Sequence, residues 1–203
     1  MDKYFEYGDA EINYLKKKDK KLGAAIERIG VIKRRVNPEP FAALIESIIG
    51  QQISSKAALT VKGKLDAISE MEPEAINALA LEEIQACGMT FQKAGYIKGI
   101  AEAAVSKSID FEALKTMGDE EIVKILTAQK GIGIWTVEML LIFSLMRPNV
   151  VSYGDLAIRR GMTNLYGLKS LSKEQFNRYA KRYSPYGSVA SLYLWELSHD
   201  EGG

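Results

Sequence analysis

The sequence contains few of the residues from which metal and redox sites are usually built. Its 203 residues include one cysteine, Cys87, and one histidine, His199. One cysteine permits no internal disulfide, and together the two residues cannot supply the four side-chain ligands of a zinc site or an iron–sulfur cluster. We therefore expect no iron–sulfur cluster and no required cofactor, and we expect the chemistry to come from carboxylates, amides, hydroxyls and the backbone.

Long apolar runs are also lacking. No segment approaches the roughly 18 consecutive apolar residues of a membrane span, and the N-terminal segment MDKYFEYGDAEINYL has acidic residues and no apolar signal region. These absences predict a cytoplasmic protein that makes no membrane contact. With 47% hydrophobic and 26% charged residues, the chain suits one globular domain or two small lobes with a shared core.

An excess of charge of one sign is absent, because the formal net charge is only +1. The distribution of charge is nevertheless uneven. Residues 1–35 carry ten Lys or Arg against six Asp or Glu, residues 159–203 carry seven against four, and residues 36–158 carry ten against sixteen. Packed together, the two termini would present one positive face, although solvated helix faces are the more common meaning of such runs.

Helical periodicity runs through nearly the whole chain, and strand-like alternation is almost absent. An all-α protein of many short helices is therefore expected. The predicted helices cover residues 10–29, 39–49, 54–68, 73–78, 81–87, 91–107, 110–117, 119–128, 134–146, 155–166, 172–182 and 186–198. Helix-capping residues are predicted at Asp119, at Ser172 with Gln175, and at Gly88 and Gly167. The segment RPNVVSYG, residues 147–154, is predicted to be an extended linker, because Pro148 cannot continue a helix.

Two glycines flank an isoleucine in the segment QKGIGIWTVEM, residues 129–139. A dinucleotide-binding fingerprint is a weak interpretation, because Thr136 stands where a third glycine should be and the preceding segment is helical. A helix, a tight hairpin and a second helix fit better. Such a turn brings backbone amides and the positive end of a helix dipole to an anion, for example a nucleic-acid phosphate. The alternative is a plain turn in which Ile132 fills the core.

Three longer segments carry a resemblance to a known family. KGIGIWTVEMLLIFSLMRPNVVSYGDLAIRRG, residues 130–161, resembles the helix-hairpin-helix, Gly/Pro-rich loop and aspartate signature of the HhH-GPD DNA glycosylases. FAALIESIIGQQISSKAA, residues 41–58, and RYSPYGSVASLYLWEL, residues 182–197, are similar to the 3-methyladenine DNA glycosylase II branch. The resemblance extends over most of the chain.

The resemblance implies the all-α HhH-GPD fold, in which two helical lobes enclose a DNA-binding cleft. The whole chain, residues 1–203, would form one such unit. One lobe would come from residues 36–158 and the other from residues 1–35 and 159–203. The expected partner is double-stranded DNA containing damaged bases, and the expected state is a monomer. The implied activity is hydrolysis of the N-glycosidic bond of alkylated purines such as 3-methyladenine after base flipping, which leaves an abasic site.

Asp155 lies twenty residues after Trp135, where the family has its essential aspartate. Cleavage of an N-glycosidic bond develops positive charge on the sugar, and a carboxylate beside it stabilises that charge and helps orient or deprotonate water. A purely structural interpretation is that Asp155 caps the following helix. Both roles are compatible, because capping would fix the position of the carboxylate.

Bifunctional members of the superfamily carry a lysine two residues after the second hairpin glycine, where this chain has Trp135. An indole cannot form an imine, so the resemblance implies a monofunctional enzyme without lyase activity. Lys130 stands where the family usually has proline, and a phosphate contact is the most that we assign to it.

An aromatic-lined pocket would bind an electron-poor flipped base by stacking and cation–π attraction. The resemblance assigns this pocket to Trp135 first, then to Tyr183, with Met139 and Leu156 as weaker candidates. For Met139 and Leu156, an ordinary place in the core is the better expectation.

The remaining assignments from the resemblance concern the backbone and the duplex. Gln52, in the segment GQQIS, would fill the gap left by the flipped base, and Gln51 would reach the minor groove beside it. An ordinary helix start capped near Ser54 is nearly as good an interpretation of this segment. The amides predicted to hold a phosphate are those of Gly131, Gly133 and Thr136. A structural Na⁺ or K⁺ ion at the hairpin would be held by the backbone carbonyls of Thr127, Gln129 and Ile132.

Three other functions stay open at this stage. They are a glycosylase for an oxidised or deaminated base, a non-catalytic helix-hairpin-helix DNA-binding module, and a helical interaction protein. The position of Asp155 favours an enzyme over a non-catalytic module. DNA binding that weakens steeply with salt would exclude a helical interaction protein.

Overall fold

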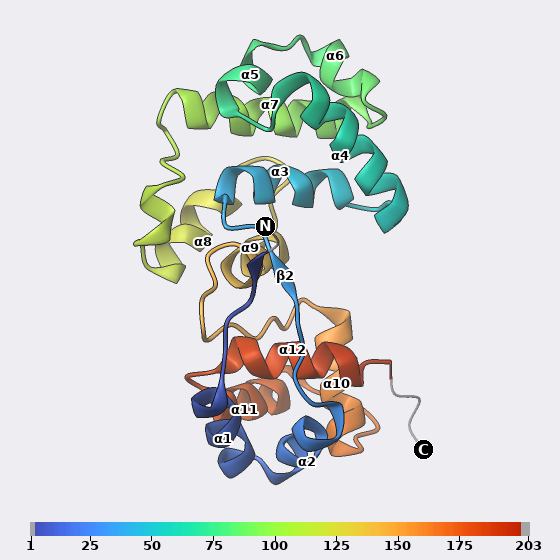
Figure 1. Cartoon of the computed structure of the whole chain (residues 1–203), viewed down its shortest axis with the longest axis vertical. Coiled ribbons are helices and arrows are strands. Elements are labelled where there is room, and N and C mark those ends of the chain that lie inside the picture. The colour runs from blue at the N-terminus through green and yellow to red at the C-terminus, as the bar shows by residue number, and fades with distance from the viewer. Residues whose placement is uncertain (1–2, 200–203) are drawn as a thin grey trace. The chain divides into compact units, whose positions relative to one another are not determined.

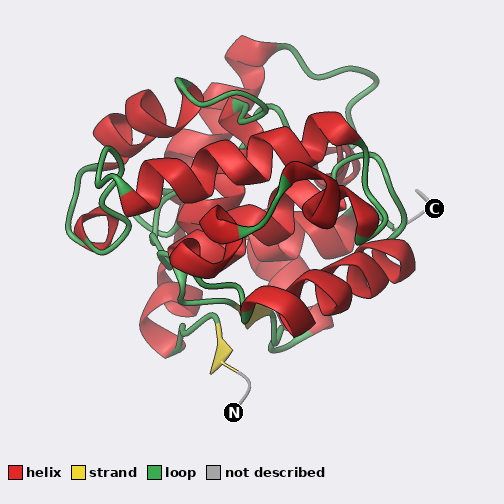
Figure 2. Cartoon of the chain, turned by 90° about the horizontal axis from the view of Figure 1, so that it is seen from above, coloured by secondary structure: helices red, strands yellow, loops and turns green. Residues whose placement is uncertain are grey.

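The computed structural model describes residues 3–199, and within them the chain is almost entirely helical (Figure 2). The helices are α1 (Asp9–Lys18), α2 (Lys20–Ile29), α3 (Pro40–Gly50), α4 (Ser55–Ser69), α5 (Pro73–Ala78), α6 (Leu81–Ala86), α7 (Phe91–Val105), α8 (Asp119–Thr127), α9 (Ile134–Phe143), α10 (Leu156–Tyr166), α11 (Lys173–Tyr183) and α12 (Gly187–Leu197). A short 3-10 helix, η1, covers Ala113–Lys115. The predicted all-α class is confirmed.

A small antiparallel ladder was not predicted. Strands β1 (Lys3–Tyr4) and β2 (Arg35–Val36) pair so that Lys3 lies opposite Val36. Strands of two residues are too short to show the period-2 alternation by which a sequence reveals a strand.

The predicted helix over residues 10–29 is two helices. Asp19 separates α1 from α2 with an extended backbone (φ −140°, ψ 107°), and its carboxylate accepts a hydrogen bond from the Leu22 amide at 3.0 Å. The predicted helix over residues 110–117 was also wrong, since only η1 forms there. The Asp110 carboxylate accepts the amides of Glu112 and Ala113, and this local turn competes with a regular helix.

Most predicted caps are confirmed. Ser172 and Gln175 form a reciprocal capping box, Gly167 ends α10 with φ +65°, and Gly88 follows α6 with φ +110°. The prediction for Asp119 was wrong by one position: Gly118 occupies the N-cap of α8, Asp119 is the first helical residue, and Gly118 has no side chain to supply a cap hydrogen bond.

Contacts divide the chain into two compact units (Figure 1). The terminal unit consists of the segment up to residue 36 and the segment from residue 141 onward, and the middle unit consists of residues 37–140. The sequence placed residues 141–158 with the middle lobe, but they group with the termini. The cause is the linker after α9, because the Ser188 amide of α12 donates to the Pro148 carbonyl at 2.9 Å and the Ser188 hydroxyl accepts from the Val150 amide at 3.0 Å.

In the terminal unit, α12 is the buried central helix, and α10 packs closely against it (Figure 1). Gly161 makes this approach possible, because a Cβ there would lie 1.8 Å from the Leu194 carbonyl oxygen. Tyr193 is fully buried, and its hydroxyl donates to the Gly30 carbonyl at 2.9 Å. These contacts anchor the segment after α2 to α12.

In the middle unit, α3 and α5 to α7 pack around a core of aliphatic side chains, with α4 against α3. Leu44, Ile45 and Ile48 of α3 have no exposed surface, and neither does Ile97 of α7. Burial of this kind stabilises a fold by about 25 cal/mol per Å² of apolar surface removed from water. The core thus fixes the position of the turn after α3, since α3 is one of its buried helices.

Over residues 3–199, no helix is long and apolar enough to cross a membrane.

Candidate functional site

The predicted hairpin is present in the middle unit. Helix α8 ends at Thr127 and α9 begins at Ile134, so the turn occupies residues 128–133. The Ile132 amide donates to the Gln129 carbonyl at 3.2 Å, and the Ile132 side chain is buried. The core-filling role of Ile132 is therefore confirmed. This role does not prevent the backbone on either side of Ile132 from binding a ligand, because Gly133 is exposed and Gly131 is partly exposed.

The two glycines of the hairpin differ in whether the fold itself requires a residue without a Cβ. Gly131 has φ +84°, and a Cβ there would lie 2.2 Å from the Tyr96 ring. Gly133 has neither constraint: its φ is not positive, it is exposed, and an added Cβ would meet nothing within 4 Å. The fold therefore accounts for Gly131, whereas Gly133 is free for close approach by an outside molecule.

The other residues predicted to contact phosphate lie beside this turn. The first amides of an α-helix have no intrahelical acceptor, and the first helical hydrogen bond of α9 joins the Val137 amide to the Gly133 carbonyl. Thr136 lies in this first turn, and only 4% of the whole residue, backbone included, is exposed, so its amide presents little surface to a ligand. Lys130 is exposed in the turn. The geometry suits an anion at the N-terminus of α9.

A second turn, Gln51 to Ser54, which we call the wedge turn, is tied to the hairpin. The Gln51 side-chain amide donates to the Gly131 carbonyl at 3.0 Å. From α7, the Lys93 ammonium group donates to the Ile49 carbonyl at 2.9 Å and also to the Gln51 carbonyl. Gln51 was expected to reach outward to a minor groove, but in this structure its amide is bound inside the middle unit.

Gln52 occupies the tip of the wedge turn. Its backbone is left-handed (φ +58°), which is uncommon for a residue with a side chain, and it is exposed. Ser54 then caps α4, as the sequence suggested, by accepting the Ala57 amide at 3.3 Å. Strained conformations of this kind persist where the surroundings enforce them, and here Lys93 and Gln51 do so.

Two candidates for the base pocket lie on α9. Trp135 is 42% exposed in the first turn of the helix, and Met139 is half-buried one turn later. An indole this exposed at a helix start is available for stacking on a ligand. Met139 is neither a core residue, as the sequence favoured, nor a fully exposed one.

Asp155 lies in the terminal unit at the N-cap of α10, and its carboxylate accepts the Ile158 amide at 2.9 Å. Only 7% of the residue is exposed. The capping prediction is confirmed. A carboxylate at this position is also stabilised by the positive end of the α10 dipole. Asp155 is therefore held in one orientation with a small part of its surface accessible.

Tyr153, two residues before Asp155, was missed from the sequence. Its ring faces the Arg159 guanidinium at 5.3 Å and the Lys173 ammonium at 5.6 Å, and it packs edge-on against Phe176 at 5.1 Å. These contacts connect α10 and α11 to the segment that precedes Asp155. The only available signal was a tyrosine in the motif YGD, which by itself indicates no role.

The structure separates the remaining pocket candidates. Leu156 is 61% exposed beside Asp155, so its expected place in the core was wrong. Tyr183 has no exposed surface, and its hydroxyl bonds to the Tyr166 hydroxyl at 2.8 Å. Burial raises the pKa of Tyr183 well above its ordinary value. A side chain with no accessible surface cannot contact a base in this conformation, so the pocket assignment of Tyr183 was wrong.

The carbonyls predicted to hold a cation belong to the end of α8 and the hairpin. Thr127 is the last residue of α8 and Gln129 and Ile132 follow in the turn. The last carbonyls of a helix lack intrahelical donors, and the negative end of the dipole favours a cation there. Only Thr127 belongs to that helix end, and the Gln129 carbonyl already accepts the Ile132 amide at 3.2 Å, so a Na⁺ or K⁺ ion at the hairpin stays a prediction. Within residues 3–199, no group of three or more His, Cys, Asp or Glu side chains is arranged to hold a metal.

A comparison with protein families matches residues 45–185 to the HhH-GPD superfamily base excision DNA repair protein. Among curated proteins, the chain is 37% identical over 166 residues to DNA-3-methyladenine glycosylase 1 of Schizosaccharomyces pombe, over 79% of this chain and 73% of that protein. It is 28% identical over 206 residues to the alkylbase DNA glycosidase-like protein mag2 of the same organism, over 97% and 96%.

Two solved structures are also similar along most of their length. The DNA-3-methyladenine glycosidase of Bacillus halodurans superimposes with a TM-score of 0.88 at 33% identity, covering 98% of this chain and 93% of that one. The Schizosaccharomyces pombe 3-methyladenine DNA glycosylase Mag1, solved in complex with abasic DNA, gives 0.81 at 32% identity, covering 93% and 96%.

Proposed function

The chain belongs to the HhH-GPD superfamily of base excision DNA repair proteins, and from this we propose that it is a DNA glycosylase acting on alkylated purines of the 3-methyladenine type. It would hydrolyse the N-glycosidic bond of a flipped base and leave an abasic site. The observation that carries the proposal is the buried carboxylate of Asp155, fixed at the N-cap of α10 within the matched region.

Asp155 has the properties that the reaction requires of a catalytic carboxylate. As the bond to the base breaks, positive charge develops on the sugar, and a carboxylate held beside it lowers the energy of that state without reorganising. The bond from the Ile158 amide restrains one carboxylate oxygen. In the proposed reaction Asp155 also orients or deprotonates the attacking water.

Base recognition is assigned to Trp135. Alkylated purines are electron-poor and often cationic, so they stack well on an exposed indole. Leu156, exposed beside Asp155, would add apolar surface, and half-buried Met139 is a further candidate. The indole also supports a monofunctional reaction of the glycosylase II type, because Trp135 replaces the lysine with which bifunctional relatives form an imine.

DNA is held in this proposal by the two turns of the middle unit. Amides of the hairpin and of the first turn of α9, at Gly131, Gly133 and Thr136, bind one phosphate, with Lys130 beside them. A Na⁺ or K⁺ ion bound by the carbonyls of Thr127, Gln129 and Ile132 would add positive charge there. Gln52, at the exposed tip of the wedge turn, fills the gap left by the flipped base.

The test is a base-release assay over a panel of duplexes containing methylated, deaminated or oxidised bases. Release of 3-methyladenine from DNA treated with a methylating agent is expected, and absence of methylpurine release would refute the assignment. Release of a deaminated or oxidised base alone would instead favour a glycosylase for that lesion. DNA binding without release of any base would favour a non-catalytic module.

The proposed lack of lyase activity has a separate test. Borohydride reduces an imine between enzyme and sugar to a stable adduct, so no covalent enzyme–DNA complex is expected, and the abasic strand is expected to stay intact without alkali. A trapped adduct would assign imine chemistry to another amine. Cytoplasmic location and a monomeric state stay predictions from the sequence.

A further inference from the structure

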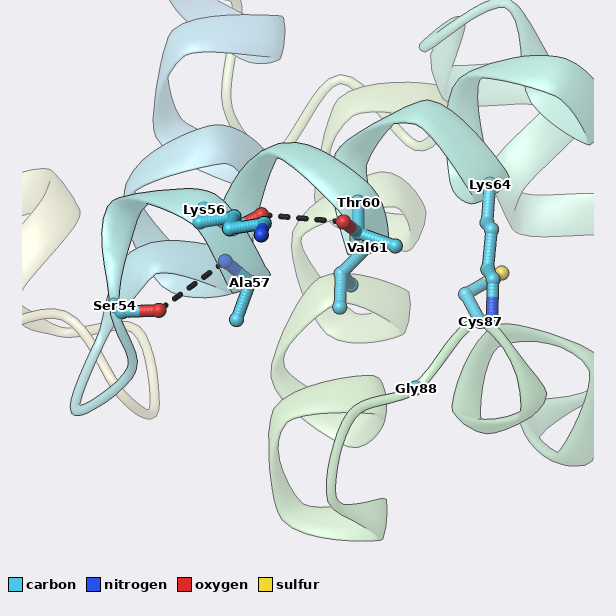
Figure 3. A pocket seen from close by; sticks show the side chains of 8 residues that line it. All are labelled: Ser54, Lys56, Ala57, Thr60, Val61, Lys64, Cys87 and Gly88. Carbon is cyan, nitrogen blue, oxygen red and sulfur yellow. Dashed lines mark hydrogen bonds between the residues drawn. The ribbon is translucent and has the colours of Figure 1, made fainter.

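A groove in the middle unit lies alongside α4 and the turn between α6 and α7 (Figure 3). Its volume is about 450 Å³. It is lined by Ser54, Lys56, Ala57, Thr60, Val61, Lys64, Cys87 and Gly88. The hairpin and Asp155 contribute nothing to this lining, so the groove is distinct from both parts of the proposed site.

The lining of the groove is positively charged. It contains two lysines, Lys56 and Lys64, and no carboxylate. In the part of the chain that the structure describes, neither lysine forms an ion pair or a side-chain hydrogen bond. This differs from Lys62 on the same helix, which pairs with Glu46 at 3.2 Å. Two unpaired ammonium groups on one wall of a groove favour an anionic ligand.

The two lysines are spaced along the helix like contacts to a repeating anion. Positions 56, 60 and 64 differ by four residues, so they lie along one face of α4, and Figure 3 shows their side chains along one side of the helix. A rise of about 1.5 Å per residue separates Lys56 from Lys64 by about 12 Å along the axis. Phosphates advance by about 3.4 Å per nucleotide along each strand of a duplex. The spacing thus suits two separate phosphates rather than one small anion.

The floor of the groove is apolar and firmly built. Val61 and Cys87 are buried, and burial raises the pKa of the Cys87 thiol. Gly88 has φ +110°, and a Cβ there would lie 3.5 Å from a methyl group of Val61. The floor thus offers apolar surface, and the charged groups of the lining are Lys56 and Lys64.

The groove also continues from the wedge turn. Ser54 ends that turn, caps α4 and lines the groove. If the Gln52 side chain is inserted into a duplex, the N-terminal end of α4 therefore lies next to the same duplex. The first amides of α4 and then Lys56 would be the next positive groups along this surface.

Resting on the proposed glycosylase function, we propose that this α4 groove binds the DNA backbone beside the lesion, with one phosphate at Lys56 and a second at Lys64. It extends the DNA footprint beyond the single phosphate assigned to the hairpin. The apolar floor would pack against the sugars of the same strand.

The test compares wild type with the double variant Lys56→Gln, Lys64→Gln in binding to a duplex that carries an abasic-site analogue. Each phosphate contact contributes about 0.9 to the slope of log K against log salt concentration. The double variant lacks two such contacts, so the magnitude of its slope is expected to be smaller than that of wild type by about 1.8. This corresponds to roughly twenty-fold weaker binding at 0.2 M salt. Thermal unfolding of both proteins, expected to be nearly equal, excludes misfolding as the cause.

A matched control removes two charges from elsewhere in the middle unit. Lys107 lines a second cavity together with five carboxylates, Glu39, Glu70, Glu72, Asp110 and Glu112, and Lys115 pairs with Glu112 at 2.8 Å. The variant Lys107→Gln, Lys115→Gln is expected to keep the wild-type slope, because that surface would repel DNA. An equal fall in slope for both double variants would indicate a general charge effect and overturn the proposal.

A second measurement locates the contacts. Methylphosphonate, which is uncharged, replaces single phosphates along each strand. Wild type is expected to lose affinity at two positions to which the Lys56→Gln, Lys64→Gln protein no longer responds. If this variant keeps the wild-type salt slope, or responds to methylphosphonate at every position as wild type does, the proposal that the groove binds DNA is refuted. The glycosylase proposal would be unaffected. Failure of wild type to bind or process damaged DNA would instead refute the proposed function.

Discussion

The Gln51 side-chain amide donates a hydrogen bond to the Gly131 carbonyl at 3.0 Å, across eighty residues of sequence. This bond joins the wedge turn to the hairpin, the two parts of the middle unit that the proposal places against DNA. Lys93 restrains the same turn from α7 through the Gln51 carbonyl. The two turns are thereby preorganised, so less ordering is needed when DNA binds.

Loss of this link should weaken DNA binding as well as folding. Gln51→Ala removes a partly buried hydrogen bond worth about 0.5–1.5 kcal/mol, and we expect abasic-duplex affinity to fall by roughly three- to ten-fold, the same free energy expressed as binding. Gln85→Ala is the matched control, since it removes a bond of the same kind, from Gln85 to the Met89 carbonyl at 3.2 Å. Equal affinities for the two variants would show that the link has no role in binding.

The two hairpin glycines should respond differently to alanine. Gly131→Ala forces a positive φ on a residue with a Cβ and drives that Cβ into the Tyr96 ring, so we expect a loss of about 2 kcal/mol or more in the free energy of unfolding. Gly133→Ala meets open space and should cost less than about 1 kcal/mol. Denaturant unfolding measures both.

DNA binding by the Gly133→Ala protein separates a structural glycine from a functional one. The added methyl group would stand where the phosphate must approach, so we expect clearly weaker binding by a protein of nearly normal stability. If the Gly133→Ala protein binds an abasic duplex as tightly as wild type does, the phosphate lies elsewhere.

Much of the fold was predictable because it depends on local signals. Periodicity located nearly every helix, and capping residues such as Ser172 and Gly167 fixed several ends. The break at Asp19 was not predictable, because the periodicity runs through it and its causes include bonds to Tyr166 and Arg182, which are distant in sequence. The same holds for residues 141–158, which join the terminal unit through contacts with α12.

Site residues whose place follows from a backbone motif could be predicted from the sequence. Site residues whose role depends on whether the side chain is buried could not. The hairpin, the cap at Asp155 and the turn at Gln52 lie within motifs, and the structure has each of them. Tyr183 and Leu156 were assigned oppositely to what the structure has, because exposure depends on packing with residues far along the chain. No pattern in the sequence joins Gln51 to Gly131.

The correction for Tyr183 leads to a prediction about lesion range. Tyr183→Phe removes the hydroxyl that bonds to Tyr166 and leaves the ring in the core, so we expect about 1–3 kcal/mol lower stability and an unchanged pattern of released bases. Trp135→Ala should have the opposite effect on activity: much slower release of cationic methylpurines, with some loss of stability as well, because more than half of the residue is buried. A changed lesion range in Tyr183→Phe would contradict the buried placement.

The strongest test of the proposed chemistry separates the two roles of Asp155. Asparagine caps helices about as well as aspartate, so Asp155→Asn should keep the hydrogen bond from the Ile158 amide and nearly the wild-type melting temperature. It lacks the negative charge that would stabilise the sugar cation. We expect single-turnover base release to fall by about 100-fold or more, the usual cost of losing one group aimed at transition-state charge.

Asp155→Ala provides the comparison, because it removes the cap as well as the charge. Its rate should match that of Asp155→Asn, while its melting temperature should fall by a further few degrees, about 2–4 °C for the roughly 1 kcal/mol that a lost N-cap costs in a chain of this size. The rate then follows the charge and the stability follows the cap. If Asp155→Asn releases bases at nearly the wild-type rate and only Asp155→Ala is slow, Asp155 acts through the helix it caps, and the catalytic carboxylate must be sought elsewhere.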